Sequence, residues 1–97
     1  MTPKQWKQIQ EIELTPGFVW KRDDNAWGVQ TRTPYWWHWF QYVLADSVSY
    51  PQYPQYPQNS IWYHRPDQGE QHQVTIIDDP IHAAQYMAAK IYLGMYE

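Results

Sequence analysis

A proline repeat in the middle of the chain limits how that part can fold. Residues 50–58 consist of three successive Tyr-Pro-Gln triplets. Proline at every third position matches the three-residue turn of polyproline II, which places the three tyrosines along one edge. Because proline has no amide hydrogen, this segment cannot be a central strand of a sheet. The sequence therefore predicts an extended loop or arm over residues 47–59.

The segment at the beginning of the chain carries the signals of a helix. Thr2 fits an N-cap and Gln5 its reciprocal partner in a capping box, with a proline at the first helical position between them. Pro16-Gly17 is a typical helix stop. Between these signals a narrow apolar stripe recurs at every third residue, formed by Trp6, Ile9 and Ile12. We expect a helix over residues 3–14.

Residues 18–22 and 27–32 have strand-like composition and flank a short polar turn, so we expect them to form a hairpin. A turn centred on Asp24-Asn25 places Trp20 opposite Val29 and Arg22 opposite Trp27. In this register, the Arg22 guanidinium is expected over the Trp27 ring as a cation–π pair.

Residues 61–65 and 73–77 form a second predicted hairpin, joined by the turn Pro66-Asp67-Gln68-Gly69. If this hairpin is symmetric about its turn, His64 lies opposite His72. These two imidazoles with a third ligand are the one arrangement that suggests a metal site. No ligand-spacing motif accompanies them, so we expect no metal and keep this pair as the alternative.

The aromatic segment over residues 35–45 can be interpreted in two ways. Thr33-Pro34 before it fits the start of a helix, but aromatic and β-branched residues favour a strand. We prefer a central strand, with the helix as the alternative. As a strand, it places Trp37 and Trp39 on one face.

The last part of the chain has the clearest helix pattern. Asp79 fits an N-cap and is followed by a proline, and Gly94 marks the end. We expect a helix over residues 80–93. Its apolar stripe follows 3-4-3-4 spacing, and its tyrosines lie elsewhere and offer a surface for a homodimer. The stripe is Ile81, Ala84, Ala88, Ile91 and Met95, and the tyrosines are Tyr86, Tyr92 and Tyr96.

The order of these elements, a helix, four to five strands in two hairpins and a second helix, predicts an α+β fold. We expect an antiparallel sheet with both helices packed on one face. The length of 97 residues leaves little room for a second module, so we expect one domain over residues 1–97 with the arm projecting from it.

Composition excludes several classes of function. Seven Lys and Arg in a chain of net charge −3 do not form the basic surface that binds a nucleic-acid backbone. The absence of cysteine excludes disulfides and thiol catalysis. No apolar run approaches the roughly 20 residues of a membrane span, so we expect a cytoplasmic protein. No catalytic or cofactor motif is present, so we expect neither an enzyme nor a cofactor.

Aromatic residues are the strongest functional signal, because the chain has seven Trp and nine Tyr. Both residue types anchor protein interfaces. We therefore expect a non-enzymatic protein that binds a protein partner. Small-ligand binding by stacking on a sugar or nucleotide is the alternative, and a self-assembling structural subunit is the third. The candidate binding residues are Trp37, Trp39, Tyr50, Tyr53, Tyr56, Trp62 and Arg65.

The end of the chain resembles that of many small proteins encoded by bacteriophages and mobile elements. The resembling residues are the strand Val74-Thr75-Ile76-Ile77 and the start of the helix, Asp78-Asp79-Pro80-Ile81-His82-Ala83-Ala84. In those proteins a Trp-rich antiparallel sheet leads into an Asp-x-Pro-type cap and a final Ala-rich helix. The resemblance covers about 25 residues and rests on helix capping, so it carries over no functional residue. It implies an accessory protein that inhibits a host factor in the host cytoplasm.

Overall fold

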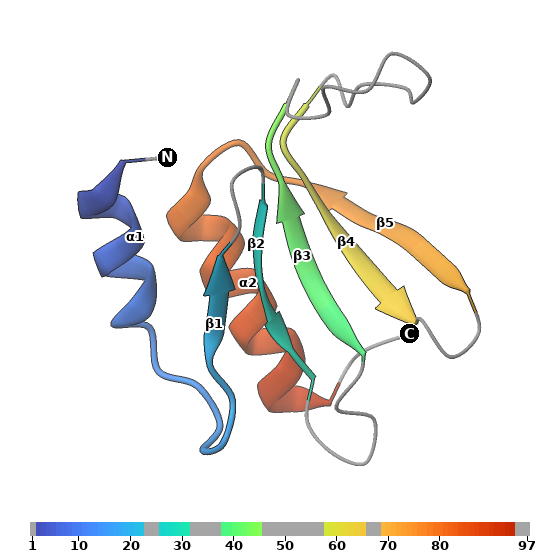
Figure 1. The fold of residues 1–97 in the computed structure, drawn as a ribbon, viewed down its shortest axis with the longest axis horizontal. Helices are drawn as coiled ribbons and strands as arrows, with labels where there is room; N and C mark the ends of the chain where they lie inside the picture. Colours follow the sequence, from blue (N-terminus) through green and yellow to red (C-terminus); the bar gives the residue numbers. More distant parts are fainter. Residues whose placement is uncertain (1, 23–25, 32–37, 46–57, 66–68, 95–97) are drawn as a thin grey trace.

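The computed structural model describes residues 2–22, 26–31, 38–45, 58–65 and 69–94. Its five strands form one antiparallel sheet in the order β1-β2-β3-β4-β5, so each strand pairs with its neighbour in sequence (Figure 1). The predicted α+β fold is confirmed. The elements are α1 (Pro3–Gln10), β1 (Trp20–Arg22), β2 (Ala26–Gln30), β3 (Trp39–Val43), β4 (Ser60–Arg65), β5 (Glu70–Ile76) and α2 (Pro80–Leu93).

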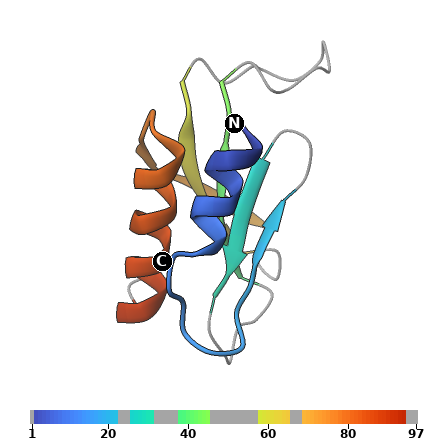
Figure 2. The same cartoon turned by 90° about the vertical axis from the view of Figure 1, so that its left-hand side faces the viewer.

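Both helices lie on the same side of the sheet, as predicted (Figure 2). Helix α2 packs against β2 and β3, and α1 packs beside α2. No helix in the described residues is long and apolar enough to cross a membrane. The core between helices and sheet consists of Ile9, Trp27, Val29, Phe40, Tyr42, Ile61, Tyr63, Ala83, Ala84, Met87 and Ile91.

Helix α1 begins as predicted but ends early. The backbone N–H of Gln5 donates to Thr2 Oγ1 at 3.2 Å, and the Thr2 N–H donates to Gln5 Oε1 at 2.9 Å, which completes the capping box. The expected end at residue 14 is wrong, because α1 ends at Gln10. The Ile12 N–H bonds to the carbonyl of Ile9 at 3.0 Å, and this three-residue spacing ends the α-helix before the Pro-Gly stop is reached.

Helix α2 confirms its predicted range. Asp79 Oδ1 accepts from the Ile81 N–H at 3.1 Å, and Gly94 ends the helix in the left-handed conformation with φ of 68°. Ile81 is partly buried, and Met95 lies outside the described residues. The alanines on the buried face permit close approach to the sheet. The buried residues of α2 are Ala83, Ala84, Met87, Ala88 and Ile91.

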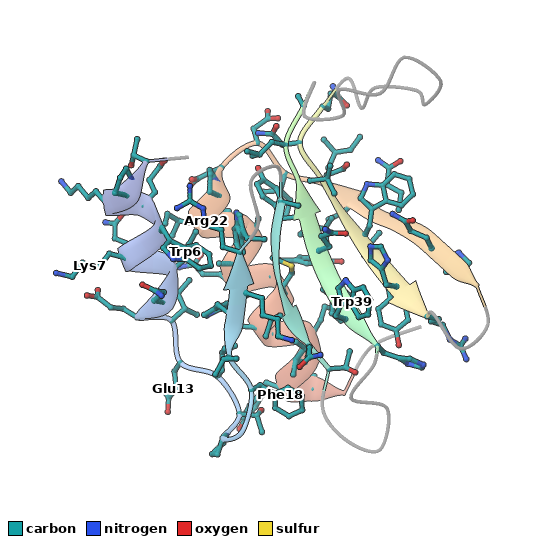
Figure 3. All side chains as sticks on the ribbon, viewed as in Figure 1. Trp6, Lys7, Glu13, Phe18, Arg22 and Trp39 are labelled. Carbon is teal, nitrogen blue, oxygen red and sulfur yellow. The ribbon has the colours of Figure 1, made fainter. Side chains whose placement is uncertain are left out.

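The first hairpin has the predicted register, with Trp20 opposite Val29 and Arg22 opposite Trp27. The predicted ring partner of Arg22 is wrong, because its guanidinium carbon lies 5.8 Å from the centroid of the Trp6 ring (Figure 3). Trp27 is only 2% exposed, and the rings of Trp6 and Trp20 both approach it at steep angles. Arg22 therefore lies over Trp6, one of the two rings that pack against Trp27.

The second hairpin changes register at the end that lies away from its turn. Ile61 pairs with Thr75 but Trp62 pairs with Gln73, so a β-bulge leaves Val74 as an extra residue in β5. The expected pairing of His64 with His72 is wrong, because Arg65 already pairs with Glu70 on the turn side of the bulge, and this register places Gln71 opposite His64. His64 lies opposite Gln71, and His72 lies opposite Tyr63.

Strand β3 is the centre of the sheet, with β2 on one side and β4 on the other. The strand prediction for the aromatic segment is confirmed over Trp39–Val43, and the helix alternative is wrong there. Phe40 and Tyr42 are buried in the core, which places Trp39 and Gln41 on the opposite face. Most of the predicted arm, residues 47–57, lies outside the described residues.

Candidate functional site

The face of the sheet opposite the helices, here called the open face, carries the candidate site. Residues that pair across antiparallel strands share a face, so the register assigns each side chain to one side. In the described part of the chain, both helices lie on the other face (Figure 2). The central open-face residues are Lys21, Gly28, Gln30, Trp39, Gln41, Trp62, His64, Gln71 and Gln73.

Four residues at the centre of this face, Trp39, Gln41, Trp62 and His64, form what we call the open-face cluster. Trp39 lies opposite His64, and Gln41 lies opposite Trp62. The indole of Trp39 and the imidazole of His64 are stacked, with centroids 4.8 Å apart and planes at 15°. The Nε2–H of His64 donates to Gln41 Oε1 at 2.6 Å. Two neighbours therefore hold the His64 ring in place.

Trp62 is fixed by a separate contact. Its Nε1–H donates to the hydroxyl of Ser60, which is buried, at 2.9 Å. Both Trp39 and Trp62 are half-buried, so part of each indole stays accessible. Aromatic side chains held in one orientation lose little entropy when a second molecule covers them. The open-face cluster is thus a preorganised aromatic surface.

The titration of His64 follows from its position in this cluster. Burial lowers the pKa of His64 below its usual value of 6.5, because desolvation disfavours the charged imidazolium. The ring is therefore neutral at pH 7. The neutral tautomer that matches the hydrogen bond to Gln41 carries its proton on Nε2.

A hollow of about 340 Å³ lies beside the cluster, along β2. Its cause is visible in the sequence of β2, where Ala26 and Gly28 occupy alternate positions and present little or no side chain. Gly28 lies between Lys21 of β1 and Gln41 of β3 in the register. The hollow is lined by Lys21, Arg22, Ala26, Trp27, Gly28, Val29, Gln30, Trp39 and Gln41.

The structure brings together only part of the candidate set. Trp39 and Trp62 lie on the open face, in adjacent strands (Figure 3 labels Trp39). Arg65 pairs with Glu70, and strand alternation places its side chain on the opposite side from His64. The remaining candidates, Trp37, Tyr50, Tyr53 and Tyr56, lie outside the described residues.

Three residues of the site were not predicted to contribute to binding. Gln41 was missed and His64 was considered only as a metal ligand, because their contact joins two strands at positions 23 residues apart in sequence, a pairing that periodicity alone does not reveal. The role of Gly28 could have been predicted from the sequence. A glycine inside a strand pattern, two residues after an alanine, is typical of a close backbone approach or a gap in one face.

The metal alternative loses its geometric basis in the register of the second hairpin, where His64 lies opposite Gln71 and His72 lies opposite Tyr63. Strand alternation also places them on opposite faces, because His72 pairs with Tyr63 of the core. Within the described ranges, no three His, Cys, Asp or Glu side chains gather as a metal site.

Comparison of this chain with models of protein families, with curated proteins and with solved structures found no match.

Proposed function

We propose that the chain is a non-enzymatic binding protein that engages a protein partner through the open-face cluster. The observation that carries this proposal is the pair of half-buried tryptophans, Trp39 and Trp62, on the face of the sheet opposite both helices. Tryptophan is among the residues most enriched at the energetic centres of protein interfaces.

The surroundings of the two indoles support recognition by a protein. The neighbouring strand β5 adds the exposed side chains of Gln71 and Gln73, which suit the polar rim of an interface. Lys21 is the charged residue among the described open-face side chains of β1–β3, so a partner with acidic groups at its edge complements the surface. Inhibition of a host factor is one concrete version of this function, and it rests on the resemblance to phage-encoded proteins.

Affinity capture with matched variants tests this proposal. The tagged wild-type protein, Trp62→Ala and Tyr92→Ala are each used to capture proteins from a lysate of the native cell. Tyr92 is 75% exposed on α2 and lies outside the open face, so Tyr92→Ala is the control. We expect a captured protein that is retained by the wild type and by Tyr92→Ala and is lost by Trp62→Ala.

The melting temperature of each variant shows whether it is folded. A folded Trp62→Ala variant that captures the same proteins in the same amounts as the wild type contradicts the proposal. Cross-linking of the captured partner to Lys21, rather than to Lys4 or Lys7 of α1, provides an independent map of the interface.

A further inference from the structure

The hollow along β2 has the shape of a small-ligand site. Its volume of about 340 Å³ falls within the range of ligand pockets. An ideal Cβ on Gly28 overlaps the carbonyl oxygen of Phe40 and lies 3.0 Å from the Cα of Gln41, so no side chain fits at this position. The gap in the open face therefore follows from the close approach of β2 to the backbone of β3.

Trp39 supplies an aromatic wall for this hollow. The His64 ring stacks on Trp39 from β4, whereas the hollow borders Trp39 from β2, where Gln30 is its partner in the register. The imidazole therefore covers one face of the indole, and Trp39 also lines the hollow. An indole surface fixed in this way packs well against the C–H face of a saturated ring or against a planar ring.

The polar groups of the hollow favour an anion that also carries hydroxyls. Gln30 and Gln41 contribute side-chain amides, and the Oε1 of Gln41 already accepts from His64, which leaves its NH₂ to donate. The charged residues of the lining, Lys21 and Arg22, are both cations. The guanidinium of Arg22 lies over Trp6, so Lys21 is the cation that we assign to the ligand.

We propose that this hollow binds an acidic monosaccharide, a pyranose ring with one carboxylate. The C–H face of the ring packs on Trp39, its hydroxyls bond to the amides of Gln30 and Gln41, and its carboxylate pairs with the Lys21 ammonium. The proposal goes beyond the binding of a protein partner, because it does not use Trp62. Either proposal is able to fail without the other.

The test is a nuclear magnetic resonance titration of the full chain with glucuronate, glucose and adenosine monophosphate. We expect glucuronate to shift the backbone amide of Gly28 and the indole signal of Trp39, with binding about 10-fold tighter than that of glucose. Lys21→Gln is expected to reduce glucuronate binding to the level of glucose. Lys7→Gln, which removes an exposed lysine on α1, is the control and is expected to keep the difference.

Three outcomes overturn the proposal. The first is the absence of shifts at Gly28 and Trp39 with glucuronate. The second is equal binding of glucose and glucuronate, which rejects a role for the carboxylate. The third is binding of adenosine monophosphate in the hollow with glucuronate excluded, which identifies the anionic ring as a nucleotide. Trp62→Ala separates the two proposals, because it is expected to abolish partner capture and to leave glucuronate binding unchanged.

Discussion

The imidazole of His64 lies flat against the indole of Trp39, with ring centroids 4.8 Å apart. Because burial lowers the pKa of His64 below 6.5, the unfolded chain binds a proton more readily than the folded chain does at this position. The contribution of the His64 ring to the free energy of unfolding is therefore fully present above pH 6.5, where the ring is neutral in the folded and the unfolded chain. This contribution is lost as the pH falls through the window between 6.5 and the lowered pKa.

We expect acid to destabilise the wild type more than a His64→Gln variant. The measurement is the change in melting temperature of each protein from about pH 7.5 to about pH 5. An equal loss of melting temperature in the wild type and in His64→Gln contradicts the lowered pKa of His64.

Gly28→Ala is expected to destabilise the fold. The added methyl group overlaps the Phe40 carbonyl oxygen, which belongs to the backbone of β3 and cannot rotate away. Overpacking of this kind costs about 1–3 kcal/mol, measured as the free energy of unfolding in denaturant. Gln30→Ala, at the next open-face position of β2, is expected to remain within about 0.5 kcal/mol of the wild type. A Gly28→Ala protein as stable as the wild type contradicts this prediction, because it shows that β2 and β3 move apart at little cost.

Local signals in the sequence were sufficient to predict both helix starts and the end of α2. Capping depends on side chains within three residues of the helix start, so Thr2 with Gln5, and Asp79, reveal these sites without tertiary information. The early end of α1 follows instead from how the chain after Gln10 packs, since Ile12 and Leu14 contact the core from outside the helix.

The β-bulge of the second hairpin depends on one residue that periodicity does not mark. Val74 is partly buried and strand-like, and nothing in its type identifies it as the extra residue of a bulge. The same limit applies to the open-face cluster. Trp39 and Trp62 were named as aromatic candidates, but their neighbours Gln41 and His64 are defined by pairing across strands, which requires the three-dimensional register.

Asp79→Ala is expected to destabilise α2. The Asp79 carboxylate accepts the Ile81 N–H, one of the amides at the helix start that has no partner within the helix. Loss of such a cap costs about 1 kcal/mol in the free energy of unfolding. Asp78→Ala is the matched control, because it removes the same charge one residue earlier without removing the cap. If both variants lose equal stability, charge rather than capping is responsible.

Tyr42→Phe is expected to weaken the connection between the sheet and the start of α2. The Tyr42 hydroxyl donates at 2.7 Å to the carbonyl of Ile77, and the carbonyl of Asp78 lies 3.0 Å from the same oxygen. Asn59 joins this group by donating from Nδ2 to the Asp78 carbonyl at 3.1 Å. The variant is expected to lose about 1 kcal/mol of unfolding free energy, and Tyr92→Phe on the exposed side of α2 is expected to lose none.

The Tyr42 hydroxyl is also expected to make the stability of the fold depend on pH in the alkaline range. Burial raises the pKa of Tyr42 from 10.0 to about 12, and the nearby Asp78 carboxylate adds to the rise, although the hydrogen bond with Asn59 opposes it. Because the unfolded chain releases this proton first, the stabilisation is complete below pH 10.0 and is lost as the pH rises toward about 12. Wild-type unfolding free energy is expected to fall over this window more steeply than that of Tyr42→Phe. Parallel pH curves for the two proteins contradict the raised pKa of Tyr42.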